Sequence, residues 1–221
     1  MKRLRIAALT ALSADLAVTA LAWARLPARV PVHWDFRGHV DRFGSRWELA
    51  LVAPVAVAVL WAVGEVLPRI DPRFAAQPHP GATEAERWGA TQTGFAIAFA
   101  LLVGVQVLAV SQALGLLHEP MRGHALLLAA FLVLFGNVIG RLRPSWFLGI
   151  RTPWTLSSDA VWRRTHRLAG RLMVPAGLLA LVLAMALPAS AAFVVSLVLL
   201  VAALLLPGAL SFFFWRAEKS K

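Results

Sequence analysis

Six apolar stretches dominate this chain of 221 residues and constrain its fold more than any other feature. They lie near residues 4–24, 47–67, 93–116, 122–140, 168–187 and 190–215. Lipid offers the backbone no hydrogen-bonding partners, so a segment that crosses the hydrocarbon forms a helix of roughly 20 apolar residues. A mean hydropathy of +0.70 with 15% charged residues is typical of such proteins. The sequence therefore predicts an all-α polytopic integral membrane protein with six transmembrane helices.

The beginning of the chain imitates a secretory signal peptide. Lys2, Arg3 and Arg5 lie at the start of the first apolar stretch, and Ala22-Trp23-Ala24 closes it with small residues around a tryptophan. The stretch is longer than the roughly 7–15 residues of a typical signal core. We therefore expect it to remain in the protein as the first span.

The positions of the basic residues predict how the chain crosses the membrane. If both termini are cytoplasmic, 16 of the 22 Lys and Arg residues lie on the cytoplasmic side and 6 lie outside. Basic residues are concentrated in cytoplasmic loops of membrane proteins. The distribution therefore favours cytoplasmic termini, and it explains most of the net charge of +11 without direct nucleic-acid binding.

Enzymatic chemistry has little support in the sequence. Cysteine is absent, which excludes disulfides and thiolate metal sites. The chain also lacks His-Glu-x-x-His, Gly-x-Ser-x-Gly and a phosphate-binding glycine loop. We expect neither an enzyme nor a cofactor.

A proline-rich stretch divides the chain. Pro72, Pro78 and Pro80 lie between the second and third apolar stretches. We expect an N-terminal two-helix unit over residues 1–70, a cytoplasmic linker over 71–92, and a four-helix unit over 93–221.

A few polar residues fall inside the predicted spans. Asp15 lies near the middle of the first, where a charge costs roughly 2.5–3.5 kcal/mol. It either has a structural role, protonated or hydrogen-bonded, or relays a proton or ion. Interhelical hydrogen bonding is the simplest explanation for Glu65, Gln106 and Asn137.

The loop between the first two spans has the pattern of a small hairpin. Polar and apolar residues alternate from Val32 to Asp41, with a turn at Arg37-Gly38. A two-residue turn places Phe36 opposite His39, whereas a three-residue loop pairs Asp35 with Asp41. Both registers remain open.

Imidazole and carboxylate groups gather in this external loop. They are His33, Asp35, His39 and Asp41, with Gly38 between them. Such groups suit zinc, but neither register brings all four to one face. A hydrogen-bonded cap over the helix ends is the favoured interpretation, and we assign no metal.

The polar segment from Gly149 to Gly170 separates the fourth and fifth apolar stretches. Arg163, Arg167 and Arg171 repeat every four residues, which predicts an amphipathic cytoplasmic helix leading into the fifth span. Each exposed arginine gains about 1 kcal/mol from anionic lipid. We expect Trp154 and Trp162 to lie at the lipid headgroups.

A rigid turn precedes this helix. Gly149 permits unusual backbone angles, and Pro153 forces Thr152 toward an extended conformation. We expect the turn to pack against helix ends, with Arg151 bound to a carboxylate or a carbonyl.

These motifs resemble the SdpI family of bacterial membrane proteins. The resemblance rests on Gly136-Asn137, on the sequence from Gly149 to Leu156, and on Trp162, Thr165-His166-Arg167 and Gly170. The external loop is similar to a domain of unknown function that often precedes SdpI. One departure is Ser145, where the family commonly has Asn.

The resemblance implies immunity against a membrane-active peptide toxin and signalling to a soluble transcriptional regulator. The toxin would meet the external loop, and the regulator would meet the basic cytoplasmic segment. The alternative is a small-solute or ion transporter in which Asp15, Gln106 and Asn137 line a polar path.

Overall fold

The computed structural model describes residues 1–35, 39–75 and 83–220. Within these ranges six helices are long and apolar enough to cross a membrane. They are α1 (Lys2–Ala22), α2 (Arg46–Ile70), α4 (Glu84–Ala113), α5 (Pro120–Ile139), α7 (Asp159–Ala186) and α8 (Ala189–Lys219). The predicted polytopic helical membrane fold is confirmed.

Two of the helices begin about two turns earlier than their apolar stretches. Thr83 caps α4 in a capping box with Glu86, so the helix starts at Glu84 instead of near residue 93. Ser158 caps α7 by accepting a hydrogen bond from the backbone of Val161. The predicted amphipathic helix and fifth span are therefore one continuous helix.

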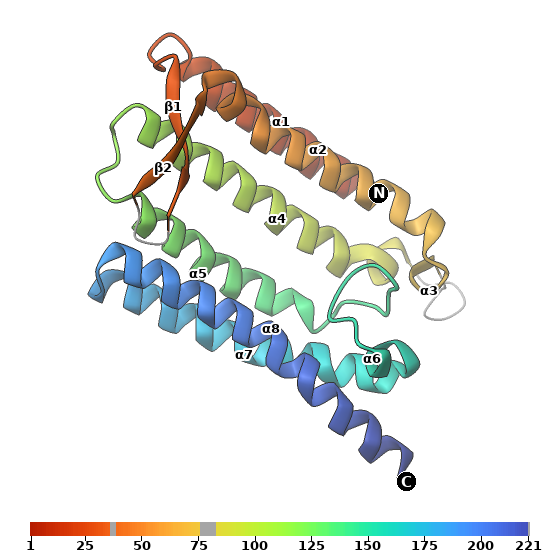
Figure 1. Ribbon diagram of the computed structural model, residues 1–221. Helices are drawn as coiled ribbons and strands as arrows, with labels where there is room; N and C mark the ends of the chain where they lie inside the picture. Colours follow the sequence, from red (N-terminus) through yellow and green to blue (C-terminus); the bar gives the residue numbers. More distant parts are fainter. Residues whose placement is uncertain (36–38, 76–82, 221) are drawn as a thin grey trace.

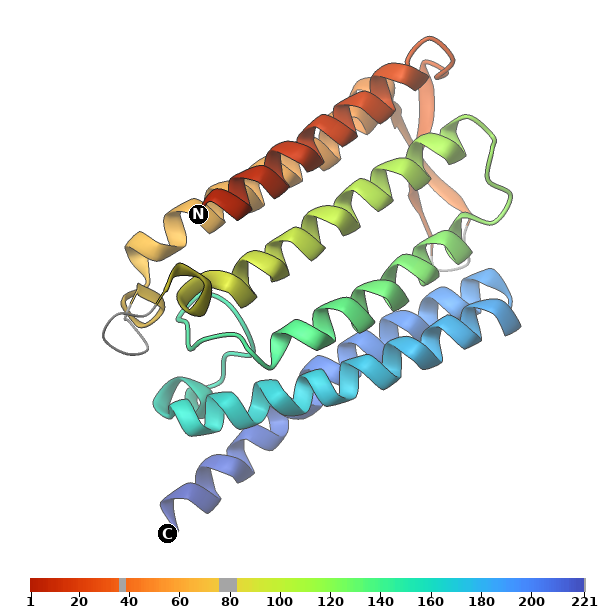
Figure 2. The same cartoon turned by 180° about the vertical axis from the view of Figure 1, so that it is seen from behind.

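The helices form two groups of three. The first contains α1, α2 and α4, the second contains α5, α7 and α8, and contacts between α4 and α5 join them (Figure 1). Both chain termini lie at the same end, together with the short helices α3 (Pro72–Ala75) and α6 (Pro153–Ser157). We call this end the termini end. Figure 2 shows the same division from behind, with the strands at the opposite, hairpin end.

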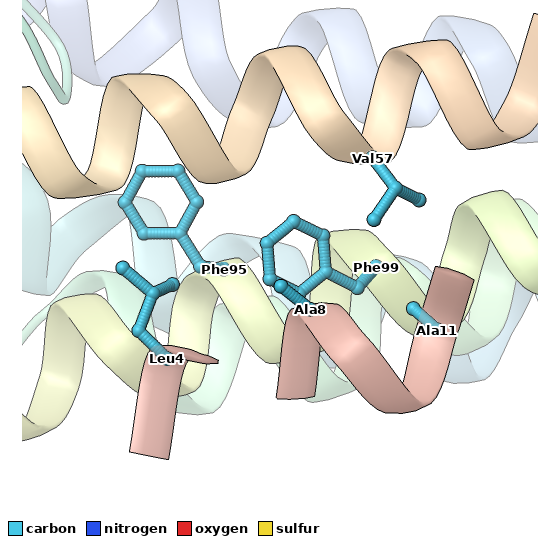
Figure 3. Close-up of a cluster of buried hydrophobic side chains, with 6 residues drawn as sticks. All are labelled: Leu4, Ala8, Ala11, Val57, Phe95 and Phe99. Carbon is cyan, nitrogen blue, oxygen red and sulfur yellow. The ribbon is translucent and has the colours of Figure 1, made fainter. Parts of the chain in front are cut away.

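Small side chains allow the helices of each group to approach closely. Figure 3 shows the cluster in the first group, where two alanines of α1 face aromatic rings of α4. Its buried members are Leu4, Ala8, Ala11, Val57, Phe95 and Phe99. In the second group, a Cβ added to Gly170 of α7 would lie 2.6 Å from the carbonyl oxygen of Gly136 on α5. Close van der Waals packing of this kind drives helix association in lipid.

The predicted hairpin is present between the first two spans. Strands β1 (Arg29–Trp34) and β2 (Val40–Ser45) are antiparallel, with Trp34 opposite Val40 and irregularities around His33. The backbone N–H of Asp35 donates to the carbonyl of His39 at 2.9 Å. The register that pairs Asp35 with Asp41 is therefore wrong, because Asp35 lies beside His39. The other register is defined by Phe36, which lies outside the described residues. The predicted turn at 37–38 lies outside the described residues.

Candidate functional site

Gly149 and His166 fix the turn that carries the predicted signature. Gly149 has φ +102°, a conformation that glycine adopts without strain. The next residue, Ile150, donates its backbone N–H to His166 Nε2 at 2.9 Å, and His166 Nδ1 lies 2.9 Å from the carbonyl oxygen of Trp162. A carbonyl oxygen only accepts, so Nδ1 carries the hydrogen and Nε2 accepts. His166 is thus a neutral structural imidazole with both nitrogens bonded.

Trp162 lies inside the protein, so its predicted place at the headgroups is wrong. It is 0% exposed, stacks on His166 with ring centroids 4.0 Å apart, and donates Nε1–H to the carbonyl of Leu142 at 2.9 Å. A buried carbonyl needs a donor, and the indole supplies it. Trp154 is half-buried and contacts Phe212 on α8 edge to face.

Threonine side chains connect the turn to α6 and α8. Thr152 caps α6, and its hydroxyl lies 2.8 Å from that of Ser211 on α8. Thr155 donates its hydroxyl hydrogen to the carbonyl of Ile150 at 2.9 Å. Arg151 donates to the carbonyl of Trp146 at 3.1 Å. The predicted packing of the turn and the predicted Arg151 pairing with a carbonyl are confirmed.

Sequence reasoning missed the most important partner of this turn, the buried carboxylate of Asp71. Asp71 Oδ2 accepts from the hydroxyl of Ser145 at 2.6 Å and from the backbone N–H of Trp146 at 2.7 Å. The dipeptide Asp71-Pro72 is a helix-start signal, because aspartate caps and proline suits the first turn. That signal predicts a cap, but not a contact 74 residues further along the chain.

Two neighbouring side chains complete this clamp. Ser145 accepts backbone N–H bonds from Phe147 at 3.1 Å and Leu148 at 3.0 Å, so the serine hydroxyl organises the loop where the family commonly has Asn. Arg73 donates to the carbonyl of Leu156 at 2.7 Å and forms an ion pair with Asp159. The start of the predicted linker is therefore bonded to the signature segment.

The arginines of α7 point away from this network. Arg163, Arg167 and Arg171 are exposed and share one helix face, as their spacing predicted. Arg164 lies over the ring of Phe214 at 4.2 Å and is held by that contact. The signature thus separates into buried residues that hold the turn and an exposed basic row.

Polar residues of the first helix group join its members. Gln106 on α4 donates Nε2–H to the hydroxyl of Thr19 on α1 at 2.8 Å and to the carbonyl of Leu49 on α2 at 3.1 Å. Glu65 on α2 pairs with Arg5 on α1 at 2.8 Å. Predicted interhelical bonding is confirmed for both Gln106 and Glu65.

Asn137 does not follow the prediction. Its side chain is exposed on α5 and donates to the carbonyl of Val133 in the same helix at 2.7 Å. Donation to the carbonyl four residues earlier satisfies a polar side chain in lipid without a second helix. Asn137 therefore lies outside any path that includes Asp15 and Gln106.

Asp15 is fully buried on α1, and neither carboxylate oxygen has a hydrogen-bond partner among the described residues. Asp15→Asn removes the possibility of an uncompensated charge at nearly constant volume. We expect the variant to fold and to melt in detergent at or above the temperature of the wild type. A melting temperature several degrees lower would show that a charged Asp15 is stabilised by a partner.

The external loop holds its titratable groups in two separate pairs. His33 Nδ1 lies 2.6 Å from Asp41 Oδ1, and His39 Nδ1 lies 3.4 Å from Asp35 Oδ2. In the part of the chain that the structure describes, no three metal-ligating groups come together. Gly38 is outside that part. The strands contact α2 and α4 through buried residues such as Val30, which fits a cap over the helix ends.

Comparison with known proteins relates these two regions to described families. Residues 141–211, which contain the turn and its network, match the SdpI/YfhL protein family. That region of the chain is similar to this family. Residues 11–58, which contain the hairpin, match a domain of unknown function, DUF1648. Together with the six apolar helices, this SdpI-type region makes the chain a multi-pass bacterial membrane protein.

One curated relative resembles part of this chain. The immunity protein SdpI of Bacillus subtilis (strain 168) is 36% identical over 53 residues, which is 24% of this chain and 26% of that protein. The match therefore spans about a quarter of the relative's length. No solved structure matches the chain.

Proposed function

We propose that this protein protects a bacterial cell against a membrane-active peptide toxin. The observation that carries the proposal is the SdpI/YfhL match over residues 141–211, together with the similarity to a protein named as an immunity protein. Protection of this kind requires binding and conformational response, and no catalytic group.

The signature segment contains buried residues and an exposed row of arginines, and we assign them different roles. Trp162 and His166 are buried, stack on each other and are joined by a hydrogen bond, and His166 accepts from the residue that follows Gly149, so they act as scaffold. Recognition then belongs to exposed surfaces, namely the hairpin at one end and the row of Arg163 and Arg167 at the other. The hairpin would meet toxin, and the basic row would meet anionic lipid or an acidic surface of a soluble regulator.

Transport is the weaker alternative. The side chain of Gln106 is held by two hydrogen bonds, and the exposed side chain of Asn137 bonds within its own helix. A continuous polar path needs these three groups in one place. Their separation favours immunity over transport.

The proposed roles require the hairpin outside and the basic row inside. The absence of native cysteine allows single-cysteine variants to be labelled without background. We expect Phe43→Cys to react with a membrane-impermeant maleimide in intact cells, and Ser157→Cys to react only after permeabilisation. The reverse pattern would contradict the assigned orientation.

Recruitment of a regulator has its own test. Native membranes carrying the wild type or Arg163→Ala/Arg167→Ala are solubilised, and the bound soluble proteins are compared. Arg25→Ala/Arg29→Ala, which removes two exposed arginines at the hairpin end, is the matched control. A regulator lost only from the α7 variant supports recruitment, and equal binding by all three proteins would contradict it.

The toxin-protection proposal is tested by expressing the protein in a sensitive bacterium and challenging it with a panel of membrane-permeabilising peptides. We expect survival to rise against at least one peptide. The control is a Gly149→Ala chain that reaches the membrane at the same level. Unchanged killing across the whole panel would contradict the proposal.

A further inference from the structure

An apolar cavity of about 510 Å³ lies between the two helix groups near the termini end. Phe95 on α4, Phe135 on α5 and Leu204 on α8 line it, and the signature loop closes it through Leu148 and Ile150. A chain buried in lipid has an apolar solvent, so an apolar cavity that opens to the bilayer fills with hydrocarbon.

The cavity reaches the surface that faces lipid. Leu205 on α8 forms part of its lining and is 67% exposed. Gly94 also lines the cavity, and a Cβ added there would lie 3.2 Å from the ring of Phe135, so the glycine lets this ring pack directly against α4. The position suits an apolar chain that enters from the bilayer.

Two arginines lie beside the same cavity at the termini end. Arg87 lies one helical turn before Thr91, a lining residue on the same helix, and Arg143 directly follows the lining residue Leu142. Burial, and then the nearby charge of Arg87, lowers the pKa of the Arg143 guanidinium, and the carboxylate of Asp159 offsets part of this effect. The two cations are therefore close enough to repel each other.

Arg87 also has capacity for an additional hydrogen bond. Its Nε is buried and has no acceptor among the described residues. A buried donor without an acceptor is costly, and a phosphate oxygen is a strong acceptor for guanidinium. An anion beside Arg87 would satisfy that donor and reduce the repulsion between the two arginines.

From this combination we infer that the cavity binds one anionic phospholipid, with an acyl chain between Phe95, Phe135 and Leu204 and the headgroup phosphate beside Arg87 and Arg143. The bound lipid fills the space between the helix groups and contacts the signature loop. This site is separate from the exposed arginine row of α7, and it does not depend on toxin protection.

Native mass spectrometry of the delipidated full-length protein tests the inference. The protein is incubated in mild detergent with equal amounts of phosphatidylglycerol and phosphatidylcholine that carry the same acyl chains. We expect one bound lipid per chain, with about a tenfold preference for phosphatidylglycerol, because two arginines contribute to headgroup binding.

Two kinds of variant distinguish binding of the lipid acyl chain from binding of the lipid headgroup. Ala98→Phe introduces a large side chain into the cavity lining and should reduce retention of both lipids. Ala100→Phe, on the exposed face of the same helix, is its control. Arg87→Gln should bind lipid but lose the preference for phosphatidylglycerol, whereas Arg163→Gln should keep it.

Melting temperatures without added lipid establish that each variant is folded. If Ala98→Phe does not fold, Leu204→Trp fills the cavity from α8 instead. Equal binding of the two lipids by the wild type would overturn the headgroup assignment. Undiminished lipid retention by a folded cavity-filling variant would overturn the acyl-chain site.

Discussion

Gly149→Ala is expected to lower the free energy of unfolding by about 4 kcal/mol, because two separate costs add at this position. A side chain at φ +102° is strained. The added Cβ would also lie 2.5 Å from His166 Nε2 and 2.8 Å from the Trp162 ring. The clash falls on the two residues that hold the turn, so the hydrogen bond from Ile150 to His166 is lost as well.

The free energy is measured by reversible unfolding in mixed micelles of mild detergent and sodium dodecyl sulfate. Gly115→Ala is the matched control, since Gly115 has φ +71° and open space where a Cβ would be. It should lose only about 1–2 kcal/mol from backbone strain. Equal losses in the two variants would show that the contacts of Gly149 contribute nothing.

Asp71→Ala is expected to release the loop at residues 141–151 and to cost about 3 kcal/mol. The substitution removes the acceptor for the Ser145 hydroxyl and for the backbone N–H groups of Trp146 and Arg73. Buried donors that lose their acceptor cost about 1–3 kcal/mol each, and water that enters the opened loop recovers part of this. The released loop should become sensitive to protease while the helices remain folded.

Limited proteolysis at the termini end, together with the unfolding measurement, checks this result. Asp71→Asn keeps one carbonyl acceptor and should retain part of the protection. Asp41→Ala, which removes an exposed carboxylate from the hairpin, should leave the loop protected. Protection of the loop in Asp71→Ala equal to that in the wild type would contradict the clamp.

The fold was predictable where the pattern is local. Lipid imposes helices of a known length on apolar stretches, so all six spans follow from hydropathy. The hairpin follows from alternation between Val32 and Asp41, although its register depends on irregularities that alternation does not encode. Arg151 was expected to bind a carboxylate or a carbonyl, and it donates to the carbonyl of Trp146.

The site was less predictable because its decisive contacts join distant parts of the chain. Tryptophan beside a span is typical of a headgroup anchor, but Trp162 is buried and donates its indole N–H to the carbonyl of Leu142. Asp71 carries only a local helix-start signal, and its bonds to Ser145 and Trp146 depend on how α2 packs near the end of α5. Asn137 was expected to form a hydrogen bond to a second helix, because hydropathy does not distinguish hydrogen bonds within a helix from those between helices.

The central claim is that this chain confers toxin immunity through surfaces held by a buried signature network. The most direct measurement is the killing curve of a peptide from the panel, taken at matched protein levels in the membrane. The wild type is expected to raise the dose needed for killing at least about tenfold, a factor that corresponds to 1.4 kcal/mol of differential interaction. Asp71→Ala should lose most of that shift. A wild-type curve that coincides with the empty-vector curve for every peptide would contradict the account.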